Sequence, residues 1–210
     1  MSEEEEVKEE EEEEEEKVVE EVRKSVILSF DIGIVNMAYC LIDEDDENVI
    51  DWECFSIKGS TMEQQCRKLA SKLDDVNFHN NSGYDMTILI ERQPKINAKM
   101  RVIEGYILMY YVLRGGNHKK IITYSPKHKL KCYVAPTDNP IVLKCKPGNH
   151  YYRKRLGIEH CRRILNGDKK YSEKIKNIFD KSKKKDDLAD TMLQALSYIR
   201  FKSPKLKKSR

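Results

Sequence analysis

The sequence predicts one α/β domain built on a mixed five-stranded sheet that is flanked by helices. Two short, almost wholly apolar runs, at 26–30 and 86–90, are typical of strands that are covered on both faces. The expected elements come as three strands, then helix–strand–helix–strand, then further helices. The 210 residues, of which 39% are hydrophobic, are enough for one core with tails.

Three strands and a helix are expected in the first part of the domain. The first two runs are continuously apolar and join at a tight turn on Gly33, whereas the third alternates between apolar and polar side chains. The helix carries Leu69, Leu73 and Val76 at helical spacing. The expected ranges are 26–30, 34–42 and 49–57 for the strands, 61–76 for the helix and 77–83 for a loop.

Two more strands and four more helices complete the expected domain. The next helix ends at Gly115-Gly116, and the strand after it stops at Ser125-Pro126. The segment 130–150 has three prolines and little periodicity, so an irregular insertion is expected there. The strands are expected at 86–91 and 119–124, and the helices at 97–113, 151–166, 171–180 and 187–200.

Charge is strongly segregated along the chain. Residues 1–22 contain 14 Glu and 2 Lys, which leaves 37 Lys and Arg against 22 Asp and Glu in residues 23–210. So basic a body indicates a polyanionic partner, nucleic acid above all. Residues 1–24 are expected to be a disordered acidic tail, 25–201 the folded domain and 202–210 a basic tail. The acidic tail either competes with DNA for the basic surface or only keeps the protein in solution.

The sequence also bears on location. No apolar stretch reaches the ~20 residues that cross a membrane, and the acidic start is unlike a secretory signal or a typical mitochondrial presequence. The six Cys form no CxxC pair. We therefore expect reduced thiols in an intracellular, reducing compartment, and no association with a membrane.

Four acidic residues stand where a metal-dependent nuclease needs them. Asp31 and Glu91 each end an apolar run, so both carboxylates are expected at the rim of the sheet. Asp187 and Asp190 lie three residues apart near the start of the last helix and share one of its faces. If that helix crosses the strand ends, all four acids meet and can bind Mg²⁺. Each acid also has a plainer interpretation, as a turn residue, a surface ion pair or a helix cap.

Three segments together resemble a known family. They are SFDIGI at 29–34, ILIERQ at 88–93 and DDLADTMLQAL at 186–196. In order and spacing they resemble the RuvC-like Holliday-junction resolvases, most of all the poxvirus and fungal mitochondrial branch, over about residues 25–200. The resemblance implies an RNase H-like fold. It also implies that the catalytic, metal-binding acids are Asp31, Glu91, Asp187 and Asp190.

The resemblance further implies a Mg²⁺-dependent endodeoxyribonuclease that acts as a homodimer. Its substrate would be branched DNA, a four-way junction resolved by paired symmetric nicks in viral concatemers or recombination intermediates. Two Mg²⁺ per active site are expected, with Mn²⁺ as a substitute. A catalytic lysine is implied after the fifth strand, where Lys129 is the first choice and Lys131 and Lys127 come next. If the protein is viral, the implied location is the host cytoplasm.

Two surfaces are expected to engage partners. Basic side chains near the fifth strand and in the helix at 151–166 suit DNA phosphates, and the two tyrosines at the start of that helix can stack on an unpaired base. The helix at 97–113 has more aromatic and Met residues than one core face needs, which indicates a dimer interface, although ordinary core packing explains it equally well. The residues assigned to DNA are Lys127, Lys131, Tyr151, Tyr152, Arg153, Lys154 and Arg155.

Other functions stay open on the sequence. A ribonuclease H or a 3′–5′ exonuclease would use the same acids on the same fold. A non-catalytic nucleic-acid-binding protein would use the same basic body, but without a metal the four carboxylates would only weaken DNA binding. A zinc site is possible on residue type, although the spacings fit no standard finger. Its ligands would come from Cys132, Cys145, His150, His160 and Cys161.

Overall fold

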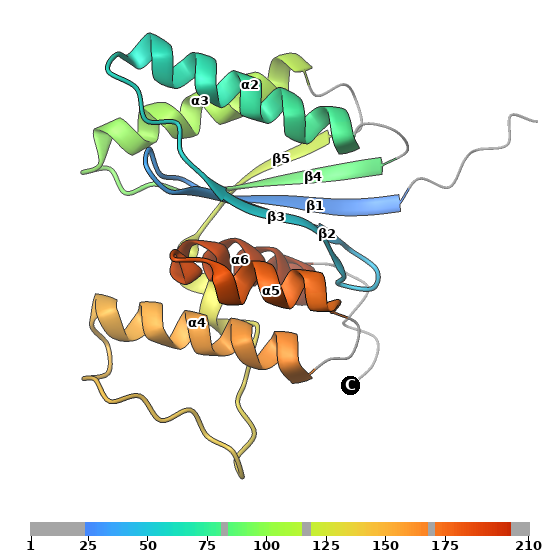
Figure 1. Ribbon diagram of the computed structural model, residues 1–210, viewed down its shortest axis with the longest axis vertical. Coiled ribbons are helices and arrows are strands. Elements are labelled where there is room, and N and C mark those ends of the chain that lie inside the picture. The colour runs from blue at the N-terminus through green and yellow to red at the C-terminus, as the bar shows by residue number, and fades with distance from the viewer. Residues whose placement is uncertain (1–23, 81–83, 115–118, 168–170, 203–210) are drawn as a thin grey trace, which may run out of the picture.

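The computed structural model describes residues 24–80, 84–114, 119–167 and 171–202. The strands are β1 Lys24–Asp31, β2 Met37–Asp43, β3 Val49–Phe55, β4 Tyr84–Glu91 and β5 Lys119–Tyr124. They form one five-stranded sheet in the order β3-β2-β1-β4-β5 (Figure 1). The β1–β2 and β2–β3 pairs are antiparallel, and the β1–β4 and β4–β5 pairs are parallel. The mixed sheet that the sequence predicts is therefore confirmed.

Helices cover both faces of the sheet. They are α2 Met62–Asn80, α3 Ala98–Arg114, α4 His150–Gly167, α5 Glu173–Lys181 and α6 Lys185–Lys202, and a 3₁₀ helix, η1 Pro126–Lys131, follows β5. α2 and α3 lie on one face, and α5 and α6 lie on the other (Figure 1). α4 packs against α6 on the side away from the sheet, which adds a further layer there.

Side chains along β1 alternate between the two faces of the sheet, and this alternation determines which residues lie on the α2 and α3 face and which on the α6 face. Val26, Leu28 and Phe30 are buried in the core under α2 and α3, whereas Ile27 is buried in the core under α6. Ser29 lies on the α6 face as well and is fully buried. By the same period of two, the carboxylate of Asp31 belongs to the α6 face. β4 repeats the pattern, with Leu89 and Glu91 on the α6 side.

The register of the parallel pair brings the two strand ends level. Ser29 is opposite Leu89, and Phe30 is opposite Ile90. Asp31 and Glu91, one residue further, therefore reach the same rim on the same face. α6 packs against β1 and β2 across this face. The fold thus places a helix with two further acids over the strand ends.

Some boundaries differ from the expected ones. β2 begins at Met37 rather than at 34, because the turn after Gly33 is so tight that a Cβ on Gly33 would lie 2.2 Å from the Asn36 carbonyl oxygen. β3 ends at Phe55, two residues earlier than expected. α2 continues to Asn80 instead of stopping at 76, since no Gly or Pro interrupts the chain before Gly83. Residues 132–149 contain neither helix nor strand, as expected for the insertion.

The predicted tails cannot be compared in the same way. The acidic tail 1–24 and the basic tail 202–210 lie outside the described residues, except for Lys24 in β1 and Lys202 in α6. None of the described helices is both long and apolar enough to span a membrane.

Candidate active site

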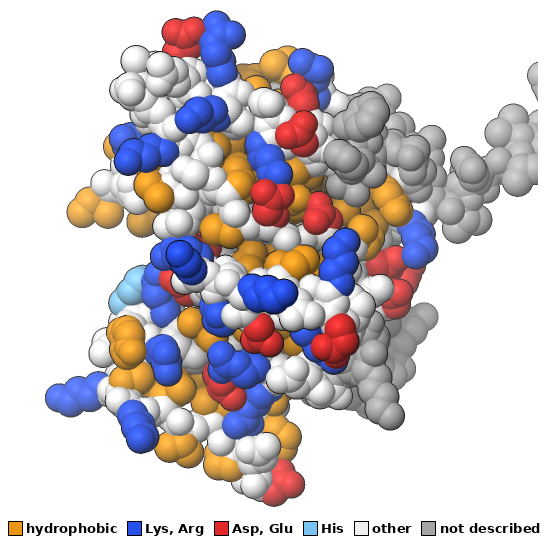
Figure 2. All heavy atoms as spheres, viewed as in Figure 1, with side chains coloured by type: hydrophobic (Ala, Val, Ile, Leu, Met, Phe, Trp, Pro, Cys, Tyr) orange, Lys and Arg blue, Asp and Glu red, His pale blue; other side chains and the backbone are white. Residues whose placement is uncertain are grey.

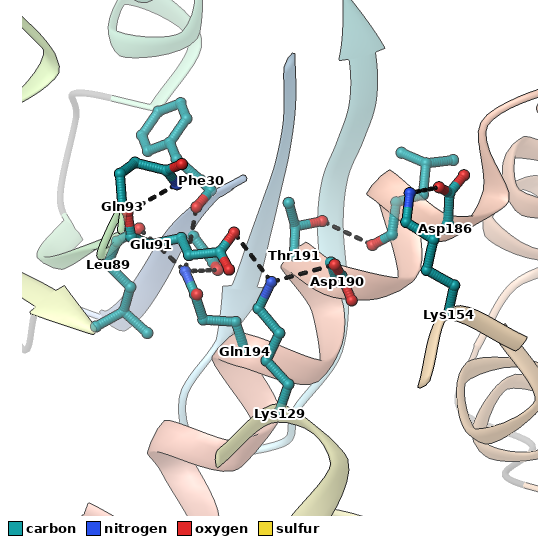
Figure 3. A network of polar contacts seen from close by, with 12 residues as sticks. Phe30, Leu89, Glu91, Gln93, Lys129, Lys154, Asp186, Asp190, Thr191 and Gln194 are labelled. Atoms are coloured by element: carbon teal, nitrogen blue, oxygen red, sulfur yellow. Dashed lines mark hydrogen bonds and ion pairs between the residues drawn. The ribbon is translucent and has the colours of Figure 1, made fainter. Parts of the chain in front are cut away.

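A buried lysine stands at the centre of the acidic rim. Lys129 Nζ lies 3.1 Å from Glu91 Oε2 and 3.3 Å from Asp190 Oδ2 (Figure 3). The Lys129 side chain is only 5% exposed. η1 makes this possible, because it turns the chain back from the end of β5 beneath α6. A charge buried to this degree needs ionic partners, and the two carboxylates supply them.

Asp31 and Glu91 behave as a coupled pair of acids. They share a side-chain hydrogen bond. Burial raises the pKa of Asp31 well above its usual value, and the Lys129 charge only partly offsets this. Burial also acts to raise the pKa of Glu91, but the hydrogen bond from Asp31 and the Lys129 charge together lower it. Of the two acids, Asp31 is therefore the one that takes up a proton first as the pH falls.

The charges around Lys129 and Asp190 stabilise each other. Burial alone would lower the pKa of the Lys129 ammonium, but the three surrounding acids outweigh it and raise the pKa above its usual value. Burial raises the pKa of Asp190, and the Lys129 charge opposes that shift. The site therefore holds a permanent cation among carboxyl groups that repel one another.

Asp187 stands apart from this cluster. It lies one turn earlier on α6, and its Oδ2 atom is buried without a hydrogen-bond partner among the described residues. Lys184 Nζ is 3.5 Å from that oxygen. Burial and the neighbouring Asp186 raise the pKa of Asp187. The structure thus brings Asp31, Glu91 and Asp190 together around Lys129, and it places Asp187 outside that group, one turn before Asp190 on α6.

Asp186 has a different partner. Its Oδ2 atom lies 2.6 Å from Lys154 Nζ, which ties the start of α6 to the start of α4 (Figure 3). Burial would raise the pKa of Asp186, but the hydrogen bond from Lys154 lowers it. α6 begins at Lys185, two residues before the expected start at 187, so Asp186 and Asp187 both lie in its first turn.

Trp52 of β3 fixes α6 in this position. Its indole Nε1 donates to the Leu188 carbonyl at 3.2 Å and to Thr191 Oγ1 at 3.1 Å. The Trp52 ring also stacks on Phe179 of α5, with 5.6 Å between ring centroids. The first turns of α6 are therefore held both by hydrogen bonds and by aromatic packing, which fixes where Asp187 and Asp190 lie.

A cavity of about 640 Å³ opens beside the acids. Glu91, Lys129 and Asp190 line one part of it. Basic side chains line another part, and Figure 2 shows Lys and Arg gathered below the notch at the left edge of the molecule. The basic lining residues are Lys127, His150, Arg153 and Lys154.

The other residues that were assigned to DNA lie outside this cavity. Tyr151, Tyr152, Arg155 and Lys131 are not among its lining residues. Tyr151 is exposed, as are Arg155 and Lys131, and Tyr152 is half-buried. Lys154, although it lines the cavity, is already engaged by Asp186. The cavity itself thus offers Lys127 and Arg153 as exposed cations next to the acids.

The donor set fits a hard divalent cation. Carboxylate oxygens are the ligands that Mg²⁺ prefers, and Asp187 Oδ2 is buried with Lys184 Nζ 3.5 Å away as its ionic partner. Within the described ranges, however, no three Asp, Glu, His or Cys side chains surround one point as ligands of a metal ion. Lys129 instead lies between Glu91 and Asp190. The lack of such a three-ligand cluster among the described residues also counts against the zinc site that was considered from the sequence.

The fold is the RNase H-like fold that RuvC-like resolvases share, and in this chain acids lie at the ends of β1 and β4 and on α6. The chain belongs to the family described as Poxvirus A22 protein, whose family model matches residues 25–202.

Solved structures support the fold. The fowlpox virus Holliday junction resolvase is 21% identical, with a TM-score of 0.56 over 83% of this chain and 96% of that one. The yeast mitochondrial Holliday junction resolvase is 18% identical, with a TM-score of 0.55 over 86% of this chain and 82% of that one. Thermus thermophilus RuvC in complex with a Holliday junction substrate is 12% identical, with a TM-score of 0.53 over 83% and 92% of the two chains.

A curated relative is similar in sequence. It is an uncharacterized protein of Acanthamoeba polyphaga mimivirus, 32% identical over 145 residues, which are 63% of this chain. The chain spans about a third of that relative's length, since the match covers 33% of it.

Sequence reasoning missed residues that hold the site together. Gln194 and Ser29 are fully buried and hydrogen-bonded to each other, and Trp52 reaches α6 through its indole. A signal for Gln194 was present, because it is a polar residue in a largely apolar stretch of α6, one turn after Asp190. Ser29 is likewise the one polar residue in the apolar run 26–30.

Proposed function

We propose that this protein is a metal-dependent endonuclease that resolves four-way DNA junctions by paired, symmetric nicks. One observation carries the proposal: Asp31, Glu91 and Asp190 gather around Lys129 at the edge of a cavity that is also lined by Lys127 and Arg153. Acids without a metal repel DNA, whereas acids with bound cations beside a basic surface suit a phosphodiester. The family of poxvirus A22 proteins and the resolvase fold support the same activity.

The residues that would hold two Mg²⁺, or Mn²⁺ in their place, are the four acids of the rim and of α6. When bound, such ions activate water, neutralise the scissile phosphate and stabilise the leaving oxygen. The role of the protein is to keep the carboxylates close together although they repel one another. Burial, and after it the repulsion from neighbouring acids, raises the pKa values of Asp31 and Asp190. The ligand set is Asp31, Glu91, Asp187 and Asp190.

Lys129 supports this chemistry as a fixed cation. It is buried, it keeps its proton and it points toward the acids rather than toward solvent. An ammonium so placed stabilises negative charge that builds on a phosphate in the transition state. Lys127 and Arg153 then orient the DNA backbone over the site, and Lys154 contributes if DNA displaces Asp186 from it. Lys131, Arg155 and the two tyrosines Tyr151 and Tyr152 make contacts further out.

A homodimer gives the two cuts their symmetry, and α3 carries a surface suited to it. Val102, Tyr106, Met109 and Leu113 follow one another at helical spacing along α3 and are exposed, Leu113 to 75%. Gly105 lies among them with open space where its Cβ would be, so a second helix can approach closely. An apolar stripe of this kind favours a partner helix, and a second copy of this chain supplies the two-fold symmetry of a junction.

The six cysteines support work in a reducing compartment. All six are free thiols, and Cys40, Cys132 and Cys161 are buried. For a viral protein such a compartment is the host cytoplasm.

A cleavage assay tests the function. A synthetic four-way junction, a linear duplex and a DNA–RNA hybrid are incubated with the protein and Mg²⁺, and the products are mapped on both strands. We expect paired nicks at symmetric positions on the junction, and little cleavage of the other two substrates. Preference for the hybrid or for free ends would make the protein a ribonuclease H or an exonuclease. Junction binding without cleavage would make it a non-catalytic binding protein.

A further inference from the structure

Gln194 makes an unusual set of contacts beneath the acidic rim. It is fully buried in α6, and its Nε2 lies 3.0 Å from Ser29 Oγ and 3.2 Å from the Phe30 carbonyl oxygen (Figure 3). The Leu89 carbonyl oxygen is 3.5 Å from the same atom. One side-chain amide thus reaches the ends of two neighbouring strands.

The chemistry of the contacts fixes the orientation of the amide. Backbone carbonyls only accept hydrogen bonds, so the atom that faces Phe30 and Leu89 must be the NH₂ group. An NH₂ group has two hydrogens for three acceptors, so it holds Ser29 and Phe30 most closely and Leu89 more weakly. Gln194 Oε1 is buried without a hydrogen-bond partner among the described residues. The side chain therefore carries a cost that its Nε2 contacts must offset.

The acceptors are next to the acids in the chain. Phe30 directly precedes Asp31, and Leu89 is two residues before Glu91. On the helix, Gln194 follows Asp190 by one turn and shares its face. One side chain therefore links the strand ends that carry Asp31 and Glu91 to the helix that carries Asp190.

We propose that Gln194 is a positioning residue, which ties α6 to the ends of β1 and β4 and so fixes the separation of Asp190 from Asp31 and Glu91. The inference rests on the proposed function, because only a site that gathers these acids needs their separation fixed. Residues that orient metal ligands typically change metal affinity or activity by about 10- to 100-fold when they are lost. Ordinary core packing by Gln194 would change stability alone.

The test compares two variants that both remove a buried hydrogen bond from α6. Gln194→Met keeps the shape of the side chain and removes the amide. Ser197→Ala is the matched control: Ser197 is also fully buried in α6, and its hydroxyl pairs with Tyr124 of β5 and donates to the Gln194 backbone carbonyl at 2.9 Å. The control therefore leaves the side-chain amide of Gln194 and its contacts with β1 and β4 in place. Both variants are measured with the metal alone and with DNA.

Without DNA, two readouts report on the acidic rim. We expect Gln194→Met to speed amide hydrogen exchange at residues 30–32 and 90–92, and to raise the Mg²⁺ concentration that half-saturates thermal stabilisation by about 10- to 100-fold. Ser197→Ala should leave both near the wild-type values. Equal values for Gln194→Met and Ser197→Ala in both readouts would overturn the proposal.

With DNA, the split between binding and turnover is the readout. We expect Gln194→Met to bind the four-way junction as tightly as wild type when Ca²⁺ replaces Mg²⁺, but to cleave it about 10- to 100-fold more slowly at saturating substrate. Slower cleavage that is fully explained by weaker binding would also overturn the proposal. If Gln194→Met does not fold, Gln194→Asn, which keeps the amide but shortens its reach, takes its place with the same outcomes.

A failure of the proposed nuclease function would give different results from a failure of the Gln194 proposal. A wild-type protein that cleaves no junction, or that Mg²⁺ does not stabilise, contradicts the nuclease. In that case the hydrogen-exchange comparison between Gln194→Met and Ser197→Ala still decides whether Gln194 fixes the strand ends.

Discussion

At the scale of single residues, the site depends on buried charges of opposite sign that compensate one another. Lys129 is enclosed by acids on β1, β4 and α6, and each acid carries a pKa shift that burial and its neighbours impose. A buried charge whose partner is removed costs several kcal/mol, about 3–5 in measured cases. Residue changes here therefore affect stability and activity together, and conservative variants separate the two best.

The acids can be tested by amide substitutions. Glu91→Gln and Asp190→Asn keep the shape of the side chain but remove a negative charge beside Lys129. We expect each to lower junction cleavage by about 100-fold or more, because a carboxylate that would hold the divalent metal is lost. Junction binding, measured by gel shift in Ca²⁺, should stay the same or tighten. Asp85→Asn, an exposed site earlier on β4, serves as the control and should cleave normally; retained activity in Glu91→Gln or Asp190→Asn would remove that residue from the set.

Asp31 predicts how stability changes with pH. Its pKa is raised in the folded protein, so between its usual value near about 4 and the raised value the folded state holds a proton that the unfolded state releases. Asp31 therefore makes the metal-free protein less stable as pH rises through this window. Asp31→Asn cannot ionise, so we expect a higher Tm than wild type near neutral pH in EDTA, and a smaller Tm difference at acidic pH. A Tm difference that does not vary with pH would contradict this explanation.

At the scale of elements, the position of α6 depends on contacts from β3. Trp52→Phe keeps an aromatic ring against Phe179 but loses the indole donor to Leu188 and Thr191. We expect a loss of about 1 kcal/mol in the free energy of unfolding, measured with urea, because the indole hydrogen bonds are lost while the Thr191 hydroxyl still donates to the Leu188 carbonyl. Thr191→Val leaves the Leu188 carbonyl as an acceptor for the indole, so it should cost less. The opposite order would show that the Thr191 hydroxyl is the more important acceptor.

The elements also show what the sequence could predict. Periodicity located every described strand and α-helix in order, since apolar runs and helical spacing are local properties, whereas the 3₁₀ helix η1 was not predicted. The start of β2 and the end of α2 were misplaced, because a tight turn and a polar continuation leave no apolar signal. The acids of the site were predictable as strand-end and helix-face residues. The hydrogen bonds that Gln194 and Trp52 make around the site were not predictable. Their partners lie more than a hundred residues away in the sequence, and tertiary packing brings them together.

At the scale of the whole molecule, the α3 stripe predicts an oligomeric state. Met109→Glu places a charge in the middle of the exposed apolar face, and burying it in a dimer would be costly. We expect the wild type to be a dimer and Met109→Glu to be a monomer by sedimentation, with paired nicking reduced to single nicks. Val134→Glu, at a site that is 86% exposed in the irregular segment, is the control and should stay dimeric. A dimer that survives Met109→Glu would place the interface elsewhere.

The segregation of charge predicts an effect of the acidic segment on DNA binding. Deleting residues 1–22 removes 14 Glu and 2 Lys and leaves a strongly basic chain. If that segment competes with DNA for the cationic surface, the deletion should tighten junction binding at low salt, and the gain should shrink as salt is added. Fluorescence anisotropy across a salt series measures this. No change at any salt concentration would favour a passive solubilising role.

The order of the elements along the chain has a consequence for synthesis. Asp31 is among the first residues of the domain to leave the ribosome, whereas Asp190 and the helix that carries it come after all five strands. A nascent chain cannot assemble a working acidic cluster until translation has passed α6. A chain interrupted before that point lacks Asp187 and Asp190 and so cannot complete the acidic cluster around Lys129.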